Sequence, residues 1–113
     1  QHYEDDALRV DPLSQTVEKR GRRVELSAIE YKLLLLLVER RGYITPREAL
    51  AHAIWGDAGG KELQYLTLYI GYLRRKIEDD PDNPTYIQTK RGVGYGFRSA
   101  GDSAPLLEWV GDV

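Results

Sequence analysis

Residues 85–98, TYIQTKRGVGYGFR, place three glycines at alternate positions after a lysine and an arginine, with aromatic residues among them. A glycine-rich stretch of this kind either binds the phosphates of a nucleotide or joins the two strands of a hairpin. Nucleotide-binding loops have the spacing G-x-G-x-x-G or G-x-x-x-x-G-K-[ST] and lead directly into a helix. Here the spacing is G-x-G-x-G and no helical periodicity follows, so the stretch predicts a β-hairpin.

The tip of this hairpin is basic. Gly92 and Gly94 are expected to supply positive φ angles in the connection, which leaves Lys90 and Arg91 at the tip. Taken alone, these two cations are equally consistent with a DNA contact and with a solvated turn.

A long amphipathic helix is predicted before the hairpin, over residues 61–79. Apolar residues recur there at spacings of three and four, as one side of a helix requires. They are Leu63, Leu66, Ile70, Leu73 and Ile77. Residues 79–84, DDPDNP, end the helix, because a proline forces the residue before it out of the helical conformation.

An earlier helix is predicted over residues 28–41. Ser27 and Glu30 have the spacing of a capping box, and Gly42 is a typical residue after a helix C-terminus. The apolar run at residues 33–38 is far shorter than the roughly 20 residues that a membrane span needs, so we expect a buried helix and no membrane segment.

A second, shorter helix is predicted over residues 46–55. Thr45 repeats the capping signal, and Pro46 is expected at the first helical position, where its missing N–H costs nothing. The side chains expected to be buried are Leu50, Ile54 and Trp55. Gly56 ends the helix, and residues 57–60, DAGG, are predicted to form a loop.

Short alternating stretches in residues 8–26 predict antiparallel strands. The whole order predicts an α+β domain over residues 7–98, with an N-terminal antiparallel sheet, three helices and a C-terminal hairpin. Residues 1–6 are expected to be a linker remnant and residues 99–113 a C-terminal tail. Trp109 in this tail can dock on the domain, contact a partner or remain free.

Composition excludes several functions. The chain has no cysteine, so it has no disulfide and no thiolate metal site, and a cytoplasmic location is expected. Its two histidines, His2 and His52, offer no catalytic constellation, and we expect neither an enzyme nor a cofactor. The net charge is −2, but residues 7–98 contain 16 basic and 12 acidic residues, a net charge of +4 that is compatible with a nucleic-acid partner.

The helix over residues 61–79 has a second side that an ordinary solvated helix would cover with charges. Its residues are Gln64, Tyr65, Leu68, Tyr72 and Arg75, together with Thr67 and Gly71. Such side chains can contact base edges and phosphates in a major groove, which admits one helix. The tyrosines can equally pack under a loop or form a protein interface.

Gly71 in the middle of this helix costs about 1 kcal/mol relative to Ala and therefore calls for a reason. Close approach to a phosphate backbone would supply one. Close packing against another helix would do so equally well.

In this order, residues 8–98 resemble the C-terminal effector domain of two-component response regulators of the OmpR/PhoB type. The motifs that carry the resemblance are EYKLL at residues 30–34, IWG at 54–56, LRRKI at 73–77 and RGVGY at 91–95. The resemblance implies a winged helix-turn-helix fold and sequence-specific binding to double-stranded DNA. Residues 65–78, YLTLYIGYLRRKIE, are similar to the subgroup that controls high-affinity potassium transport.

The resemblance also implies roles for single residues. Those expected in the major groove are Gln64, Tyr65, Leu68, Tyr72 and Arg75. Arg91 would enter the adjacent minor groove, and Arg74 and Lys90 would contact phosphates. Those expected to contact RNA polymerase are Asp57, Ala58, Gly59 and Gly60.

Further partners follow from the same resemblance. The resemblance implies a receiver domain before Gln1, which fits a chain that contains no methionine, and a cognate histidine kinase as its partner. It also implies binding as a dimer to tandem half-sites. The sequence departs from many members at Leu68, Tyr69, Gly71 and Tyr72, where arginine or histidine is found along the recognition helix, and at Gly96, where arginine is common in the wing. Weak DNA affinity of the isolated domain is therefore expected. The alternative function is a winged-helix module for protein-protein assembly.

Overall fold

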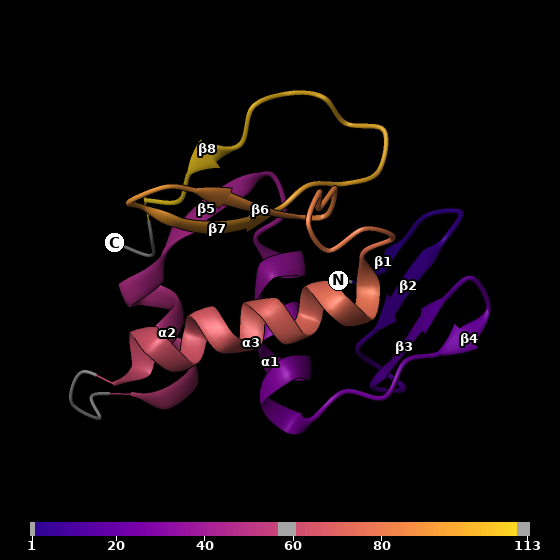
Figure 1. The fold of residues 1–113 in the computed structure, drawn as a ribbon. Coiled ribbons are helices and arrows are strands. Elements are labelled where there is room, and N and C mark those ends of the chain that lie inside the picture. Colours follow the sequence, from indigo (N-terminus) through magenta and orange to yellow (C-terminus); the bar gives the residue numbers. More distant parts are fainter. Residues whose placement is uncertain (1, 57–60, 111–113) are drawn as a thin grey trace.

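The structure is a computed structural model that describes residues 2–56 and 61–110, and Figure 1 shows its fold. Its helices are α1 (Ala28–Glu39), α2 (Arg47–Trp55) and α3 (Glu62–Ile77). Its strands are β1 (Tyr3–Glu4), β2 (Leu8–Asp11), β3 (Thr16–Lys19), β4 (Arg22–Arg23), β5 (Tyr43–Pro46), β6 (Ile87–Lys90), β7 (Gly94–Phe97) and β8 (Leu107–Glu108). Within these ranges the strands form an antiparallel sheet in the order β1-β2-β3-β4 and a second sheet in the order β6-β7-β5-β8. The predicted α+β architecture is confirmed.

The core is built around α3, which crosses the molecule below the sheet formed by β6, β7, β5 and β8 and ends beside the N-terminal sheet (Figure 1). The predicted apolar side of α3 is buried, and its residues that are at most 2% exposed are Leu66, Ile70, Leu73 and Ile77. They share one cluster with four α1 residues, which are Leu33, Leu34, Leu37 and Val38. Each such side chain contributes about 1.5–3 kcal/mol on burial, so this contact fixes how α3 lies in the domain.

The capping box at the start of α1 is confirmed. The Glu30 N–H donates to the Ser27 hydroxyl at 3.2 Å, and the Ser27 N–H donates to the Glu30 carboxylate at 2.8 Å. α1 ends two residues earlier than expected, because the chain already turns there: the Tyr43 N–H donates to the Arg40 carbonyl at 3.0 Å. Gly42, with φ of +90°, completes this turn into β5.

The N-terminal sheet begins inside the segment expected to be a linker, residues 1–6. Tyr3 and Glu4 form β1, which pairs with β2. Tyr3 is only 6% exposed, and its ring packs edge-on against Phe97 at 4.9 Å. Because this aromatic side chain is part of the core, the folded unit begins before Ala7.

Asp5 connects this first strand to Tyr86, which directly precedes β6. Its carboxylate accepts hydrogen bonds from the hydroxyls of Tyr3 (2.6 Å) and Tyr86 (2.7 Å) and from the N–H groups of Ala7 (2.6 Å) and Leu8 (2.8 Å). Burial opposes ionisation of this carboxyl, but the hydrogen bonds outweigh it and hold the pKa of Asp5 below its ordinary value. Burial, above all, raises the pKa of Tyr3 to about 12.

The start of α2 differs from the prediction. Thr45 and Pro46 belong to β5, and α2 begins only at Arg47. The Thr45 hydroxyl is buried and makes no hydrogen bond with the described residues, so it does not cap the helix. Pairing of β5 with β7 keeps these two residues extended, and this long-range contact overrides the local capping signal.

The glycines of the hairpin serve two purposes. Gly92 has the expected positive φ, +78°, in the turn. Gly94 was expected to have one too, but it lies in β7, where a Cβ atom would come within 1.9 Å of the Thr45 carbonyl oxygen. At Gly96 a Cβ atom would lie 2.2 Å from the Tyr43 carbonyl oxygen. These two glycines are needed because β5 passes directly against β7.

The tail folds onto the domain. Leu107 and Glu108 form β8, which lies parallel to β5 along its outer edge (Figure 1). The Trp109 ring packs edge-on against Tyr43 at 5.3 Å, with the Arg40 guanidinium 4.8 Å from the ring centre. Of the three possibilities for Trp109, the structure shows docking on the domain.

None of the described helices is long and apolar enough to cross a membrane.

We expect the Asp5 network to contribute measurably to stability. Asp5→Ala should lower the free energy of unfolding at pH 7 by about 2–4 kcal/mol, because two tyrosine hydroxyls and two N–H groups lose their acceptor in a partly buried site. Urea unfolding measures this change. The matched control is Asp6→Ala at the neighbouring exposed position, which should stay within about 0.5 kcal/mol of the wild type.

The effect of Asp5→Ala should shrink in acid. The folded-state pKa of Asp5 is depressed, so its stabilisation is present above the unfolded-state pKa of about 4 and is lost as the pH falls below that value. Urea unfolding from pH 7 downward should therefore show the wild type and Asp5→Ala converging below pH 4. A difference that stays constant with pH would contradict the role of the ionised carboxylate.

Candidate nucleic-acid interface

α3 carries an exposed stripe opposite its buried side. Gln64, Leu68, Gly71 and Arg75 follow one another at steps of four, three and four residues, which keeps them on one side of a helix. Gln64 and Arg75 are exposed, and Leu68 is 47% exposed. The stripe thus presents an amide near one end, an apolar side chain and a glycine in the middle, and a cation near the other end.

The tyrosines of α3 flank this stripe on the side of α2. The Trp55 ring centre lies 6.2 Å from that of Tyr65 and 6.0 Å from that of Tyr69. Tyr69 and Tyr72 meet at right angles at 5.5 Å. A row of aromatic rings therefore joins α2 to α3, and Tyr65 remains 47% exposed at its edge.

Arg75 lies at the border between the stripe and the aromatic row. Its guanidinium group is 5.1 Å from the centre of the Tyr72 ring, a favourable cation-π distance. Because Arg75 remains exposed, this contact orients the cation without burying it.

Arg74 points to the other side of α3, toward the hairpin of β6 and β7. Its Nη2 donates to the Ile87 carbonyl at 2.8 Å and to the Thr89 hydroxyl at 2.7 Å, and the group lies 5.9 Å from the Tyr95 ring centre. Burial lowers the pKa of Arg74, although Tyr95 and Glu78 oppose the shift. Its Nε is buried and has no partner among the described residues. Arg74 therefore ties α3 to both strands of the hairpin.

The C-terminal end of α3 is fixed by two carboxylates. Glu78 accepts hydrogen bonds from the N–H groups of residues 85–87 at 2.8 to 3.1 Å, which positions the chain entering β6. Lys76 donates to the buried Glu30 carboxylate of α1 at 2.6 Å. Burial opposes ionisation of Glu30, but the bonds from Lys76 and Ser27 hold its pKa below the ordinary value. The helix and the hairpin are thus held in a fixed relation.

The tip of the hairpin carries two cations in different states. Arg91 is exposed and makes no hydrogen bond or ion pair with residues 2–56 or 61–110. Lys90 lies 3.5 Å from the Glu108 carboxylate of β8, measured from Nζ to Oε1, and both side chains are about half exposed. The Val93 N–H donates to the Lys90 carbonyl at 2.9 Å and closes the turn.

The structure places the residues predicted to contact DNA on two surfaces, the exposed side of α3 and the hairpin of β6 and β7. Gln64, Leu68 and Arg75 share one exposed stripe, Tyr65 and Tyr72 border it, and Arg74, Lys90 and Arg91 lie on or toward the hairpin. Asp57, Ala58, Gly59 and Gly60, the predicted loop, lie outside the described residues.

Three contacts were not predicted from the sequence: those of Arg74 with Thr89 and with Tyr95, and that of Lys90 with Glu108. Thr89 and Tyr95 are cross-strand neighbours that both touch Arg74, and strand alternation in the hairpin could have placed them together. Glu108 gives no sequence signal for its contact with Lys90, because that contact depends on the tail returning to the sheet.

Two reasons were offered for a glycine at position 71, close approach to a phosphate backbone and close packing against another helix. The structure does not support the second. A Cβ atom there would meet just one described neighbour, Nη1 of Arg75, at 3.9 Å. No second helix packs closely enough to require a glycine at this position in the described part of the chain.

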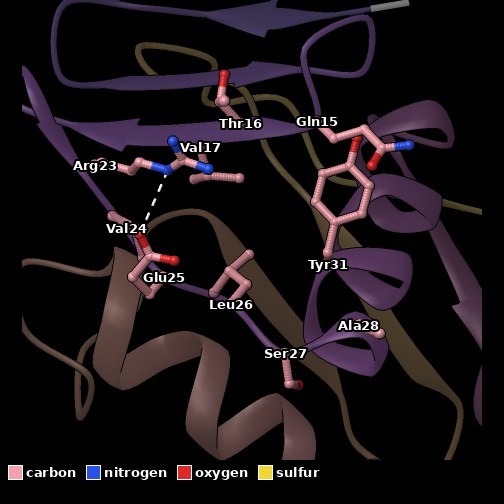
Figure 2. A pocket seen from close by; sticks show the side chains of 10 residues that line it. All are labelled: Gln15, Thr16, Val17, Arg23, Val24, Glu25, Leu26, Ser27, Ala28 and Tyr31. Atoms are coloured by element: carbon pink, nitrogen blue, oxygen red, sulfur yellow. Dashed lines mark ion pairs between the residues drawn. The ribbon is translucent and has the colours of Figure 1, made fainter.

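A separate cavity of about 260 Å³ lies between β3, β4 and the start of α1 (Figure 2). Arg23 and Glu25 form an ion pair beside it at 3.4 Å, and Gln15 and Tyr31 line another side. The Tyr31 hydroxyl is buried there without a hydrogen-bond partner in the described ranges. Within those ranges, no group of three or more His, Cys, Asp or Glu residues is arranged to hold a metal ion.

The helices α2 and α3, with one side of α3 exposed and a basic hairpin beside it, define a winged helix-turn-helix domain. The family described as "Transcriptional regulatory protein, C terminal" matches residues 21–97. This chain belongs to that family.

Curated relatives include the transcriptional regulatory protein KdpE of Mycobacterium tuberculosis (strain ATCC 25618 / H37Rv). It is 38% identical over 96 residues, which is 85% of this chain and 42% of the relative. The KDP operon transcriptional regulatory protein KdpE of Escherichia coli (strain K12) is 33% identical over 88 residues, 78% of this chain and 39% of the relative. The chain spans about two fifths of the length of these relatives.

The fold of this chain is similar to that of several solved structures. The response regulator DrrB of Thermotoga maritima, an OmpR/PhoB homologue, superposes with a TM-score of 0.80 at 36% identity, covering 87% of this chain and 44% of DrrB. The DNA-binding domain of CpxR from E. coli gives 0.74 at 33% identity, covering 89% and 99%. The RstA DNA-binding domain of Klebsiella pneumoniae in complex with the RstA box gives 0.74 at 29% identity, covering 87% and 97%.

The same substitution at two glycines should have opposite effects. Gly71→Ala should raise the free energy of unfolding by up to about 1 kcal/mol, since Ala is the better helix former and the added methyl group makes an ordinary contact with Arg75 at 3.9 Å. Gly94→Ala should lower it by about 3 kcal/mol or more, because the methyl group would overlap the backbone of β5. Urea unfolding of both variants measures these two changes in the free energy of unfolding. A neutral Gly94→Ala would show that β5 can move away from β7.

Proposed function

We propose that this chain is the DNA-binding effector domain of a two-component response regulator that controls transcription, with α3 in the major groove and the hairpin of β6 and β7 as the wing. The observation that carries the proposal is the exposed stripe of α3 beside a basic wing tip, where Arg91 is exposed and makes no ion pair with the described residues. Membership of a family of transcription regulators supports it.

The stripe of α3 suits direct contact with base edges. A glutamine such as Gln64 can form paired hydrogen bonds with adenine, and an apolar side chain such as Leu68 can contact the thymine methyl group. Tyr65 and Tyr72 would face the groove wall beside the stripe. Arg75, oriented by Tyr72, would reach a guanine or a phosphate. Gly71 would let the DNA backbone come close to the helix.

The wing would add contacts outside the major groove. Arg91, exposed at the turn, would enter the adjacent minor groove, where a narrow groove attracts arginine. Lys90 and Arg74 would contact phosphates. Because Arg74 also donates hydrogen bonds to β6 and contacts the Tyr95 ring of β7, it would set the position of the wing relative to α3.

The remaining proposals concern the whole protein. The relatives are about twice as long as this chain, which supports a receiver domain, phosphorylated by a histidine kinase, as part of the full protein. Binding as a dimer to tandem half-sites, contact of residues 57–60 with RNA polymerase and a cytoplasmic location are proposed with it. The two relatives named KdpE support a place among regulators of potassium transport.

A protein-protein module is the less favoured alternative. It needs an interface built from the tyrosines of α3, whereas Tyr69 and Tyr72 are partly buried against each other and Tyr65, although 47% exposed, packs on one side against Trp55.

The proposal is tested by DNA binding across a salt series, with a duplex enriched from a random-sequence library. Arg75→Ala and Arg91→Ala should each weaken binding and reduce the log-log salt slope by about 0.9 if each arginine neutralises one phosphate. Arg22→Ala, at an exposed position in β4 of the other sheet, is the matched control and should leave the slope unchanged. Absence of binding at low salt, or indifference to both substitutions, would refute these assignments.

A further inference from the structure

The C-terminal segment, residues 99–110, is an addition to the domain. The family match ends at residue 97, and the chain beyond it arches back over the wing sheet to its outer edge (Figure 1). There the Leu107 N–H donates to the Gly42 carbonyl at 3.1 Å and the Trp109 N–H donates to the Ile44 carbonyl at 2.7 Å.

Side chains anchor this segment at two points. The Trp109 ring is held between Tyr43, 5.3 Å away, and the Arg40 guanidinium, 4.8 Å away. Leu106 covers Gly96, where a Cβ atom would lie 2.9 Å from its Cδ1. The glycine thus leaves the space that the returning segment occupies.

The attachment is nevertheless weak. β8 is two residues long, and Leu107 is 64% exposed. The indole N–H of Trp109 is buried without a hydrogen-bond partner among the described residues, which offsets part of the gain from packing. A segment attached in this way can be displaced by a competing ligand.

The segment brings a carboxylate to the wing. Glu108 Oε1 lies 3.5 Å from Nζ of Lys90, and Lys90 directly precedes Arg91 in the chain. Both partners of the ion pair are about half exposed, so the carboxylate lowers the positive potential at the wing tip in the space open to an approaching phosphate.

We propose that residues 99–110 form an acidic strap that competes with DNA phosphates for Lys90, so that loss of Glu108 raises the affinity of the wing for DNA. The inference rests on the proposed DNA-binding function. It assigns to the segment the role of limiting electrostatic affinity, which favours dissociation from non-specific DNA, where phosphate contacts supply nearly all the binding.

The expected size of the effect follows from the exposure of the pair. Exposed ion pairs are weak, so the strap reduces affinity without blocking binding, and Glu108→Gln should tighten binding by about two- to fivefold at 0.1 M salt. Since Lys90 freed from Glu108 can neutralise its phosphate more fully, the log-log salt slope should become steeper by up to about 0.9.

The experiment compares residues 1–113 as wild type, Glu108→Gln, Lys90→Gln and the double variant on the enriched duplex across a salt series. In the Lys90→Gln background, Glu108→Gln should have less than half of its effect. The matched control is Asp102→Asn, which removes one negative charge from the same segment at its exposed turn and should leave affinity unchanged. Trp109→Ala loosens the anchor and should act in the same direction as Glu108→Gln, with thermal unfolding to confirm that the domain is folded.

The outcomes separate the two claims. If the wild type binds and Glu108→Gln leaves the affinity unchanged or weaker, the strap fails while the proposed function stands. An equal effect of Asp102→Asn, or a full effect of Glu108→Gln without Lys90, would show a general charge effect and overturn the strap as well. If no variant binds DNA at low salt, the proposed function fails and the strap fails with it.

Discussion

The close approach of β5 to β7 is the constraint on which the rest of the structure depends. β5 lies between α1 and α2 in the chain, whereas β7 is the second strand of the wing. Gly94 and Gly96 carry no side chain where the carbonyl groups of Thr45 and Tyr43 come closest. Since any Cβ atom would overlap this backbone, the two glycines determine where the wing sits relative to the helices.

The position of the wing then decides how α3 and the hairpin act together. Arg74 bonds β6 from α3, and Glu78 at the end of α3 holds the N–H groups of residues 85–87 that lead into β6. Arg74 and Glu78 therefore hold the hairpin of β6 and β7 in a fixed position relative to α3. Under the proposed function, a rigid relation of this kind would let Arg75 and Arg91 act at two places on one ligand, because the backbone positions that carry them are set before binding.

Two carboxylates that hold this arrangement, those of Asp5 and Glu30, each accept hydrogen bonds from distant parts of the chain. Asp5 accepts four hydrogen bonds, and two of them come from tyrosines 83 positions apart in the chain, Tyr3 and Tyr86. Glu30 caps α1 and at the same time receives Lys76 from α3. Carboxylates with several donors have depressed pKa values, so these contacts stabilise the fold at neutral pH and weaken in acid.

The sequence by itself determined the elements whose signals are local. Ser27 and Glu30 marked the start of α1, Gly56 and Pro81 marked helix ends, and the spacing of apolar residues marked the buried side of α3. It determined the family as well, because the motifs occur in order. Such signals are readable because capping and helical periodicity involve residues within four positions of each other.

Only the tertiary structure decided the parts that depend on distant residues. β1, β5 and β8 are two to four residues long and exist because another strand lies beside them, which no local pattern announces. Thr45 lost its predicted capping role, and Gly94 proved necessary for packing and not for a turn, for the same reason. Lys90 gained a carboxylate partner 18 positions away. The physical reason is common to all three: strand pairing and side-chain contacts between distant segments can outweigh local preference, and they are fixed only when the chain has folded.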